Sequence, residues 1–221
     1  MNLRPLHRLI VASLGMLAIA TAACGTANSS AGSGRQASQG AVRPIVLRAD
    51  YDRLPFNTPQ RMCAALLVTD GTVGKLGAGH WNTPGAARPV GADLTRLETR
   101  GYQIYTPLQL NPGTRNLVDR RSHSSRELAA IGGEAGVDRV ETDSFPMPKP
   151  GGRYLMVFVP GQVAEGTAPD LDTLILIDAF AIDAHGNVAM PSTQLDANGR
   201  DVSTVKTVAL SQLESQLAGC R

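Results

Sequence analysis

Two long apolar runs in the second half of the sequence constrain the fold more than any other feature. Residues 153–160 read RYLMVFVP and residues 173–182 read TLILIDAFAI, with aliphatic and aromatic side chains predominating in both. Short apolar runs of this kind are typical of buried β-strands. We therefore expect these two segments to be the most buried strands of a sheet. Asp178 interrupts the second run, which places it either on a solvated face or in a buried, paired site.

Weaker strand patterns occur at residues 44–48, 102–105, 188–190 and 202–208. Between them the sequence indicates short helices. Thr58 can cap a helix that begins at Pro59 and runs to residue 67, and a strand over residues 64–68 is the alternative.

Two further helices are predicted from capping-box spacings, in which a Ser precedes a Glu by three residues. The pair Ser124 and Glu127 predicts a helix that ends near residue 131, and the pair Ser211 and Glu214 predicts a helix at the C-terminus. The pattern lacks regular βαβ units. We therefore expect an α+β fold, with a mainly antiparallel sheet and a few short helices in a single domain over residues 43–221.

The three cysteines divide into one at the N-terminus, Cys24, and two in the domain, Cys63 and Cys220. An even pair in an exported domain indicates a disulfide, and two buried free thiols are the alternative. Leu213, Leu217 and Cys220 fall on one face of the last predicted helix. The predicted bond would therefore connect the last helix to the first.

The N-terminus has the layout of a secretory signal. Basic residues at 4–8 precede an apolar run over residues 9–20, which is short for a membrane span of ~20 residues. The segment ATAAC at residues 20–24 resembles the lipobox of bacterial lipoprotein precursors. The resemblance implies cleavage after residue 23 and lipidation of Cys24. A retained apolar anchor and an ordinary signal with a free Cys24 are the alternatives.

Residues 25–40 are rich in Gly, Ala and Ser and contain no aromatic side chain, as in a flexible tether. The sequence thus predicts a signal peptide over residues 1–23, a lipidated cysteine with a linker over 24–42, and a globular extracytoplasmic domain. The expected location is the extracytoplasmic face of the cell membrane, where the lipid holds the domain, so the membrane is the first expected partner.

Charge excludes nucleic acid as an expected partner. Removal of residues 1–23 removes Arg4 and Arg8, and it leaves 19 basic and 19 acidic residues. A neutral domain without a basic stretch lacks the electrostatic footprint of a nucleic-acid-binding protein.

Signatures of catalysis and of metal or cofactor binding are also missing. The sequence contains no G-x-S-x-G, no H-x-x-x-H, no P-loop and no dinucleotide fingerprint. Residues 183–187 begin like a calcium loop, but Gln194 replaces the glutamate at the twelfth position, and a hairpin turn explains the segment. We expect no cofactor, no metal ligands and no catalytic residues. The enzyme alternative would need His80 or His185 near Asp178.

Aromatic side chains make up only 4% of the chain, and the single tryptophan lies in a polar loop. Large rigid side chains with a polar edge are enriched at binding surfaces. The candidate binding residues are therefore His80, Trp81, Asn82, Tyr102 and Tyr105. The alternative is that Trp81 fills one end of an aromatic-poor core.

The predicted function is a membrane-anchored lipoprotein that acts as a binding or protein-interaction module of the cell envelope, rather than as an enzyme. An envelope protein or a small ligand is the expected partner. An envelope hydrolase, or a small-ligand-binding protein with its site near Trp81, is the alternative.

Overall fold

The structure is a computed structural model. It describes residues 42–48, 55–90, 97, 100–121, 127–166, 169–195 and 201–220, without the side chains of residues 192–195 and 201–203. The chain divides into units Met1–Gly40 and Ala41–Arg221, and the described residues all belong to the second unit. The predicted signal segment and Cys24 lie outside the described residues.

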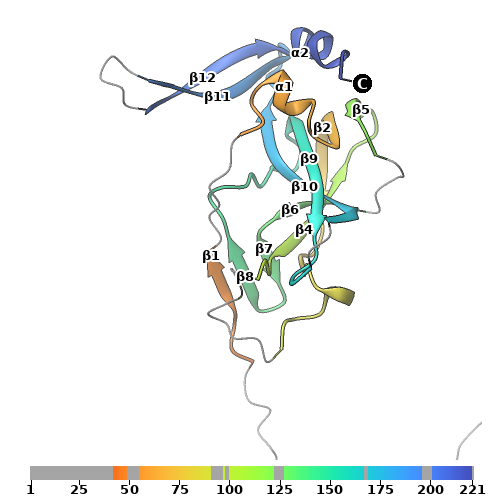
Figure 1. Cartoon of the computed structure of the whole chain (residues 1–221), viewed down its shortest axis with the longest axis vertical. Coiled ribbons are helices and arrows are strands. Elements are labelled where there is room, and N and C mark those ends of the chain that lie inside the picture. The colour runs from red at the N-terminus through yellow and green to blue at the C-terminus, as the bar shows by residue number, and fades with distance from the viewer. Residues whose placement is uncertain are drawn as a thin grey trace, which may run out of the picture. The chain divides into compact units, whose positions relative to one another are not determined.

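Twelve strands and two α-helices make up this unit in the described residues (Figure 1). The strands are β1 (Val46–Arg48), β2 (Leu67–Leu76), β3 (His80–Trp81), β4 (Ile104–Leu110), β5 (Arg115–Asp119), β6 (Glu127–Ile131), β7 (Gly133–Ala135), β8 (Asp138–Glu141), β9 (Arg153–Gln162), β10 (Pro169–Ala181), β11 (Asn187–Leu195) and β12 (Asp201–Ala209). The α-helices are α1 (Pro59–Met62) and α2 (Leu210–Leu217), and a 3-10 turn spans Pro84–Ala86.

Five of the strands form a closed barrel. The hydrogen-bonded order is β4-β6-β10-β9-β2, and β2 pairs again with β4 to close the ring. β10 and β6 are parallel, and the other four contacts of the ring are antiparallel. The expected α+β class is therefore wrong: this is a mostly β fold, and its two α-helices span only four and eight residues. The capping-box spacing at Ser124 and Glu127 misled because it is a local signal, whereas strand pairing here connects segments that are distant in sequence.

The two strongest predicted strands are confirmed as β9 and β10, which pair along most of their length. Their side chains alternate between two cores, as a strand with two buried faces requires. Met156 and Phe158 of β9 point into a cluster to which all five barrel strands contribute, so this cluster fills the barrel. Leu155 and Val157 lie in a different cluster, with residues of both helices and of β11.

Closing so few strands into a ring requires strong local bending. The pairing register shifts between Val73 and Lys75 in β2, and again between Leu176 and Asp178 in β10. Such bulges bend a strand and increase its twist. The second bulge leaves Asp178 buried, where its Oδ2 accepts a hydrogen bond of 2.6 Å from the Phe56 backbone. Of the two alternatives for Asp178, the structure shows the buried, paired one.

The predicted helix from Ser124 to residue 131 is wrong in its described part. Ser124 lies outside the described residues, and Glu127–Ile131 forms β6, between β4 and β10 in the barrel. Ala129 and Ala130 are completely buried there. Tertiary packing on both sides of this strand therefore decides its conformation, against its helix-forming composition.

The first helix begins as predicted and ends early. Thr58 accepts a hydrogen bond from the Arg61 amide, and Pro59 occupies the first helical position. The helix stops at Met62, and Cys63 forms its C-cap. Strand β2 then starts at Leu67.

The C-terminal helix is confirmed, but its predicted cap is not. α2 starts at Leu210, its N-cap is Ala209, and no side chain caps it. Ser211 is therefore inside the helix, where its carbonyl accepts a hydrogen bond from Ser215 Oγ. Leu213 and Leu217 are buried, as the predicted face requires.

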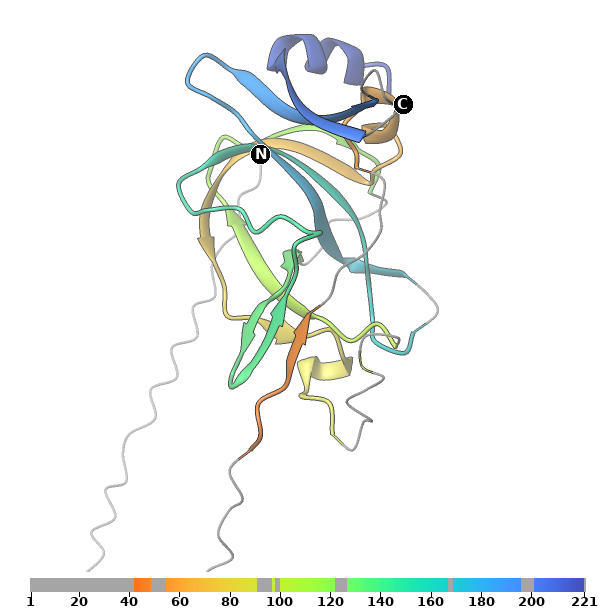
Figure 2. The ribbon, with the colours of Figure 1, turned by 90° about the vertical axis from the view of Figure 1, so that its left-hand side faces the viewer.

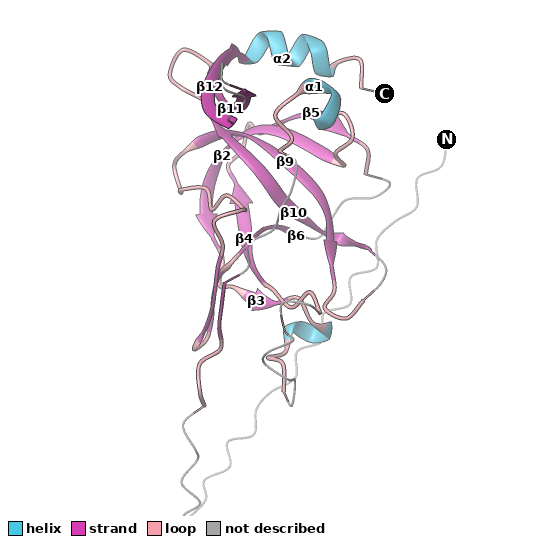
Figure 3. Ribbon diagram, turned by 60° about the vertical axis from the view of Figure 1, so that its left-hand side comes forward, coloured by secondary structure: helices cyan, strands magenta, loops and turns pink. Residues whose placement is uncertain are grey.

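β3 pairs with β4 and β5 pairs with β2, so both extend the barrel sheet, and the other five strands form two small sheets. The hairpin β11–β12 lies with α1 and α2 at one end of the barrel, and the sheet β1-β8-β7 lies toward the other (Figures 1 and 2). Figure 3 shows α1 beneath α2, although 147 residues separate their ends in the sequence, from Met62 to Leu210. One apolar cluster packs the hairpin and both helices against the barrel, and Ile177, Val188 and Leu213 belong to it.

Candidate functional site

Strand pairing brings the predicted binding residues together only in part. β3 pairs with β4 so that His80 faces Tyr105 and Trp81 faces Ile104. The indole of Trp81 is nevertheless 2% exposed, and its Nε1 donates to Asp138 Oδ2 at 3.2 Å. Trp81 therefore fills a core cluster in the described structure, which is the alternative that the sequence left open.

The side-chain amide of Asn82 is hydrogen-bonded within the fold through both its nitrogen and its oxygen. Its Nδ2 donates to the carbonyls of Gly101 and Gln162, and its Oδ1 accepts from the amide of Gln103. All three bonds are 2.8–2.9 Å long. An amide whose donors and acceptor are satisfied internally holds loops together, and it presents no free group to a ligand.

The tyrosines and the histidine also have partners within the fold. The Tyr105 hydroxyl donates to the Gln162 carbonyl at 2.8 Å, and Tyr105 is 3% exposed. The Tyr102 hydroxyl donates to Glu165 at 2.9 Å, and this bond raises the pKa of Tyr102. His80 lies edge-on to Tyr105, and its Nε2 is 3.0 Å from Glu127 Oε1. These contacts indicate a structural use for the group, and binding at these residues stays a prediction.

The enzyme alternative requires His80 or His185 next to Asp178, and the hydrogen bonds described for the two histidines go to other residues. His80 is bonded to Glu127, the amide of His185 donates to Asp183 in a turn, and neither contact involves Asp178. Within the described ranges, no three His, Cys, Asp or Glu side chains are placed to hold a metal ion.

Two buried carboxylates escaped the sequence analysis. Asp138 is 1% exposed and accepts hydrogen bonds from Arg88, Trp81 and the Ile45 amide. Burial by itself would raise the pKa of Asp138, but these hydrogen bonds outweigh it and lower the pKa. Asp138 thereby fastens β1 and β3 to β8.

The second buried carboxylate, Asp70, joins β2 to its two neighbouring strands, β5 and β9. It accepts from Arg153 Nε at 2.9 Å and from Arg115, whose guanidinium also bonds Glu214 of α2. Burial would raise the pKa of Asp70, but the two arginines lower it overall. No local pattern could have shown either network, because the partners lie 45 to 99 residues apart in sequence.

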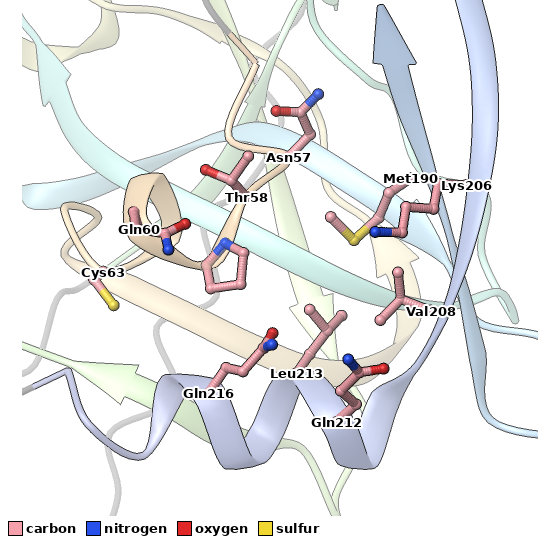
Figure 4. A pocket seen from close by; sticks show the side chains of 11 residues that line it. Asn57, Thr58, Gln60, Cys63, Met190, Lys206, Val208, Gln212, Leu213 and Gln216 are labelled. Carbon is pink, nitrogen blue, oxygen red and sulfur yellow. The ribbon is translucent and has the colours of Figure 1, made fainter.

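A concave site lies elsewhere, between the β11–β12 hairpin and the two helices (Figure 4). It encloses about 460 Å³, within the range of small-molecule sites. We call it the hairpin–helix pocket. Its apolar lining consists of Pro59, Cys63, Met190, Val208 and Leu213, and its polar lining of Asn57, Thr58, Gln60, Lys206, Gln212 and Gln216.

The polar groups of the pocket converge from three segments. Gln212 and Gln216 are one turn apart on α2, so they project from the same side of the helix, and Figure 4 shows them facing α1. Lys206 is paired directly opposite Met190 in the hairpin, and Figure 4 shows its ammonium beside the Met190 side chain. The pocket therefore combines an apolar floor with amide groups and one cation at its rim.

Several of these polar groups are uncommitted. Within the described part of the chain, the side chains of Gln60, Lys206, Gln212 and Gln216 make no hydrogen bond or ion pair. Asn57 differs, because its Nδ2 donates to the Pro191 carbonyl at 2.7 Å. That bond occupies the outer edge of β11 beside the pocket.

The predicted pairing of Cys63 and Cys220 is confirmed, since the two lie at disulfide distance with Cα atoms 5.2 Å apart. Cys63 ends α1 and Cys220 follows α2. Because these helices supply opposite walls of the pocket, the bond holds the walls together.

A second cavity, of about 410 Å³, lies beside β8 and offers less to a ligand. Its charged residues are engaged with one another or with neighbours: Arg139 pairs with Glu141 at 3.1 Å, and Asp143 pairs with Arg48 at 2.6 Å. The hairpin–helix pocket is therefore the better candidate site.

Among the described residues, no helix has the length and apolar character needed to span a membrane. Comparison of the chain with protein-family models, curated proteins and solved structures finds no match.

Proposed function

We propose that this protein is a lipid-anchored, extracytoplasmic ligand-binding module of the cell envelope, and that its site is the hairpin–helix pocket. The observation that carries the proposal is the pocket itself, with a buried apolar floor of Met190, Val208 and Leu213. Four of its polar side chains have no partner within the described structure: Gln60, Lys206, Gln212 and Gln216. Small-molecule sites commonly combine such a floor with a few convergent polar groups.

The N-terminal sequence supports the location. The apolar run, the ATAAC segment and the tether after Cys24 fit a domain held near a membrane by a lipid. Anchoring would raise the effective concentration of the pocket toward envelope ligands. Replacement of Cys24 by serine should abolish labelling by fatty acid and release the protein from the membrane fraction. Labelling that persists in Cys24→Ser would refute the anchor.

A thermal-shift panel tests ligand binding. The oxidised full-length protein is mixed with short peptides, sugars, peptidoglycan fragments, lipid head groups and divalent cations. A ligand that binds only the folded state raises the melting temperature, and the rise grows with the logarithm of the ligand concentration above the Kd. We expect at least one class to give a dose-dependent rise.

Two tryptophan variants locate the effect. Gln216→Trp places a large side chain in the pocket, and Ser215→Trp places it on the adjacent, exposed position of α2 that does not line the pocket. The rise should vanish in Gln216→Trp and remain in Ser215→Trp. A rise that persists in both variants, or no rise with any member of the panel, would contradict the proposal.

A further inference from the structure

The charge of the hairpin–helix pocket restricts the ligand it can take. Lys206 is the one charged side chain among the described residues that line it, and no acidic side chain of the described chain joins that lining. The acid nearest in sequence to the lining glutamines, Glu214, is held by Arg115 at 2.5 Å. The pocket is therefore selective against cations and favourable to a single negative charge.

Lys206 is positioned to use that charge. Its partner across the hairpin is Met190, which is 5% exposed, so the Lys206 stem starts from the inner face of the hairpin. Lysine commonly packs its methylene stem on apolar surface while the ammonium stays in water. Within the described chain the ammonium has no carboxylate partner. An incoming anion therefore meets a cation that the fold does not already neutralise.

The glutamines add a second requirement. Each carboxamide of Gln60, Gln212 and Gln216 offers both donors and an acceptor. A group that matches such a rim itself has a donor and an acceptor, as an amide bond has. Below the rim, Leu213 and Val208 present an apolar surface that suits a methyl or other short aliphatic group.

We infer that the ligand is an N-acylated carboxylic acid, with its carboxylate on Lys206, its amide on the glutamines and its aliphatic part on Leu213. This chemistry is shared by the carboxyl end of a short peptide and by an N-acetylated sugar acid. The inference rests on the proposed function, and it adds the class of ligand for the same pocket.

Calorimetric titration of the oxidised full-length protein tests the ligand class. The probes are N-acetyl-alanyl-alanine, the same compound with its carboxylate converted to an amide, and N-acetylmuramic acid. We expect an acidic probe to bind about fivefold more tightly than the neutral amide, as an exposed ion pair allows. Binding of the peptide or of the sugar acid identifies the source. The preference should shrink as salt is added.

Variants attribute the preference to Lys206. Lys206→Gln should remove the preference for the acid over the neutral amide, whereas Lys206→Arg should keep it. Lys75→Gln is the matched control, because Lys75 is an exposed lysine on β2 outside the pocket.

The inference is overturned if acid and amide bind equally, or if Lys206→Gln keeps the preference. It is also overturned if the acidic probes fail to bind while another panel ligand gives a shift that Gln216→Trp abolishes. In that case the proposed function still stands. If no ligand of any class binds, both fail.

Discussion

The carboxylate of Asp138 is held by Arg88 through two hydrogen bonds, from Nε at 2.7 Å and from Nη2 at 2.9 Å, although Asp138 is almost completely buried. The same carboxylate accepts from the Ile45 amide at 2.8 Å. This relationship fixes β1, the first strand of the domain, to β8.

Replacement of Asp138 by alanine should lower the free energy of unfolding by about 3 kcal/mol, because it leaves buried donors without an acceptor. The midpoint of urea unfolding measures this change. As a control, Asp143→Ala removes an exposed pair with Arg48 and should change stability by less than about 1 kcal/mol. Equal losses of stability in the two variants would show that buried Asp138 contributes no more to the free energy of unfolding than an exposed ion pair does.

Stability should fall in acid partly because of Asp70. Its pKa in the folded protein is below the usual 3.8, since hydrogen bonds from Arg153 and Arg115 outweigh the effect of burial. The site therefore stabilises the fold above the unfolded-state pKa, and this stabilisation disappears as the pH falls through the lower folded-state value. Asp70→Asn should lower stability at neutral pH and flatten its decline below about pH 4.

Urea unfolding at a series of pH values measures both effects of Asp70→Asn. Glu134→Gln, at an exposed position on β7, should leave the profile unchanged. A profile of Asp70→Asn that runs parallel to the wild type would exclude this source of acid sensitivity.

The cysteine pair should contribute to stability and to the pocket. A bond between residues 157 positions apart closes a long loop, and loss of such bonds typically costs about 2–5 kcal/mol. The double variant Cys63→Ser/Cys220→Ser should lose stability on this scale and bind pocket ligands more weakly. Wild-type protein treated with a thiol reductant provides the matched comparison and should lose stability on the same scale. Unchanged ligand affinity in the double variant would mean that the pocket walls hold without the bond.

Substitution of Trp81 distinguishes the two candidate binding sites, the Trp81 loop and the hairpin–helix pocket. Trp81→Ala should lower stability by about 3–5 kcal/mol, as expected for a buried aromatic side chain, and should leave pocket binding intact under folding conditions. Trp81→Phe keeps much of the packing and should cost less. Loss of ligand binding in Trp81→Phe, with the fold preserved, would show that the ligand binds at the Trp81 loop and not in the hairpin–helix pocket.

The sequence allowed prediction of β9, β10 and the C-terminal helix, because their apolar patterns are local and long. It misled at residues 127–131, where a good capping-box spacing coincides with a barrel strand. There the neighbours on both sides, β4 and β10, decide the structure. Barrel closure itself depends on the pairing of β2 with β4, which no local pattern specifies.

The candidate site was beyond prediction for the same reason. Its lining comes from the segment 57–63, the hairpin and α2, so its two ends are more than 140 residues apart in sequence. Trp81 and Asn82 seemed the most distinctive residues, but their polar groups form hydrogen bonds within the fold. The pocket instead uses common surface residues, glutamine and lysine, whose identity carries no signal until the fold brings them together.

Mapping of amide chemical shifts in the ¹⁵N-labelled protein tests the central claim most directly. The ligand with the largest thermal shift is titrated, and the residues whose signals move are identified. The account predicts that the largest changes lie at residues 57–63, 206–208 and 212–216, around the hairpin–helix pocket. Changes centred on His80, Trp81 and Tyr105, with the pocket unaffected, would contradict it.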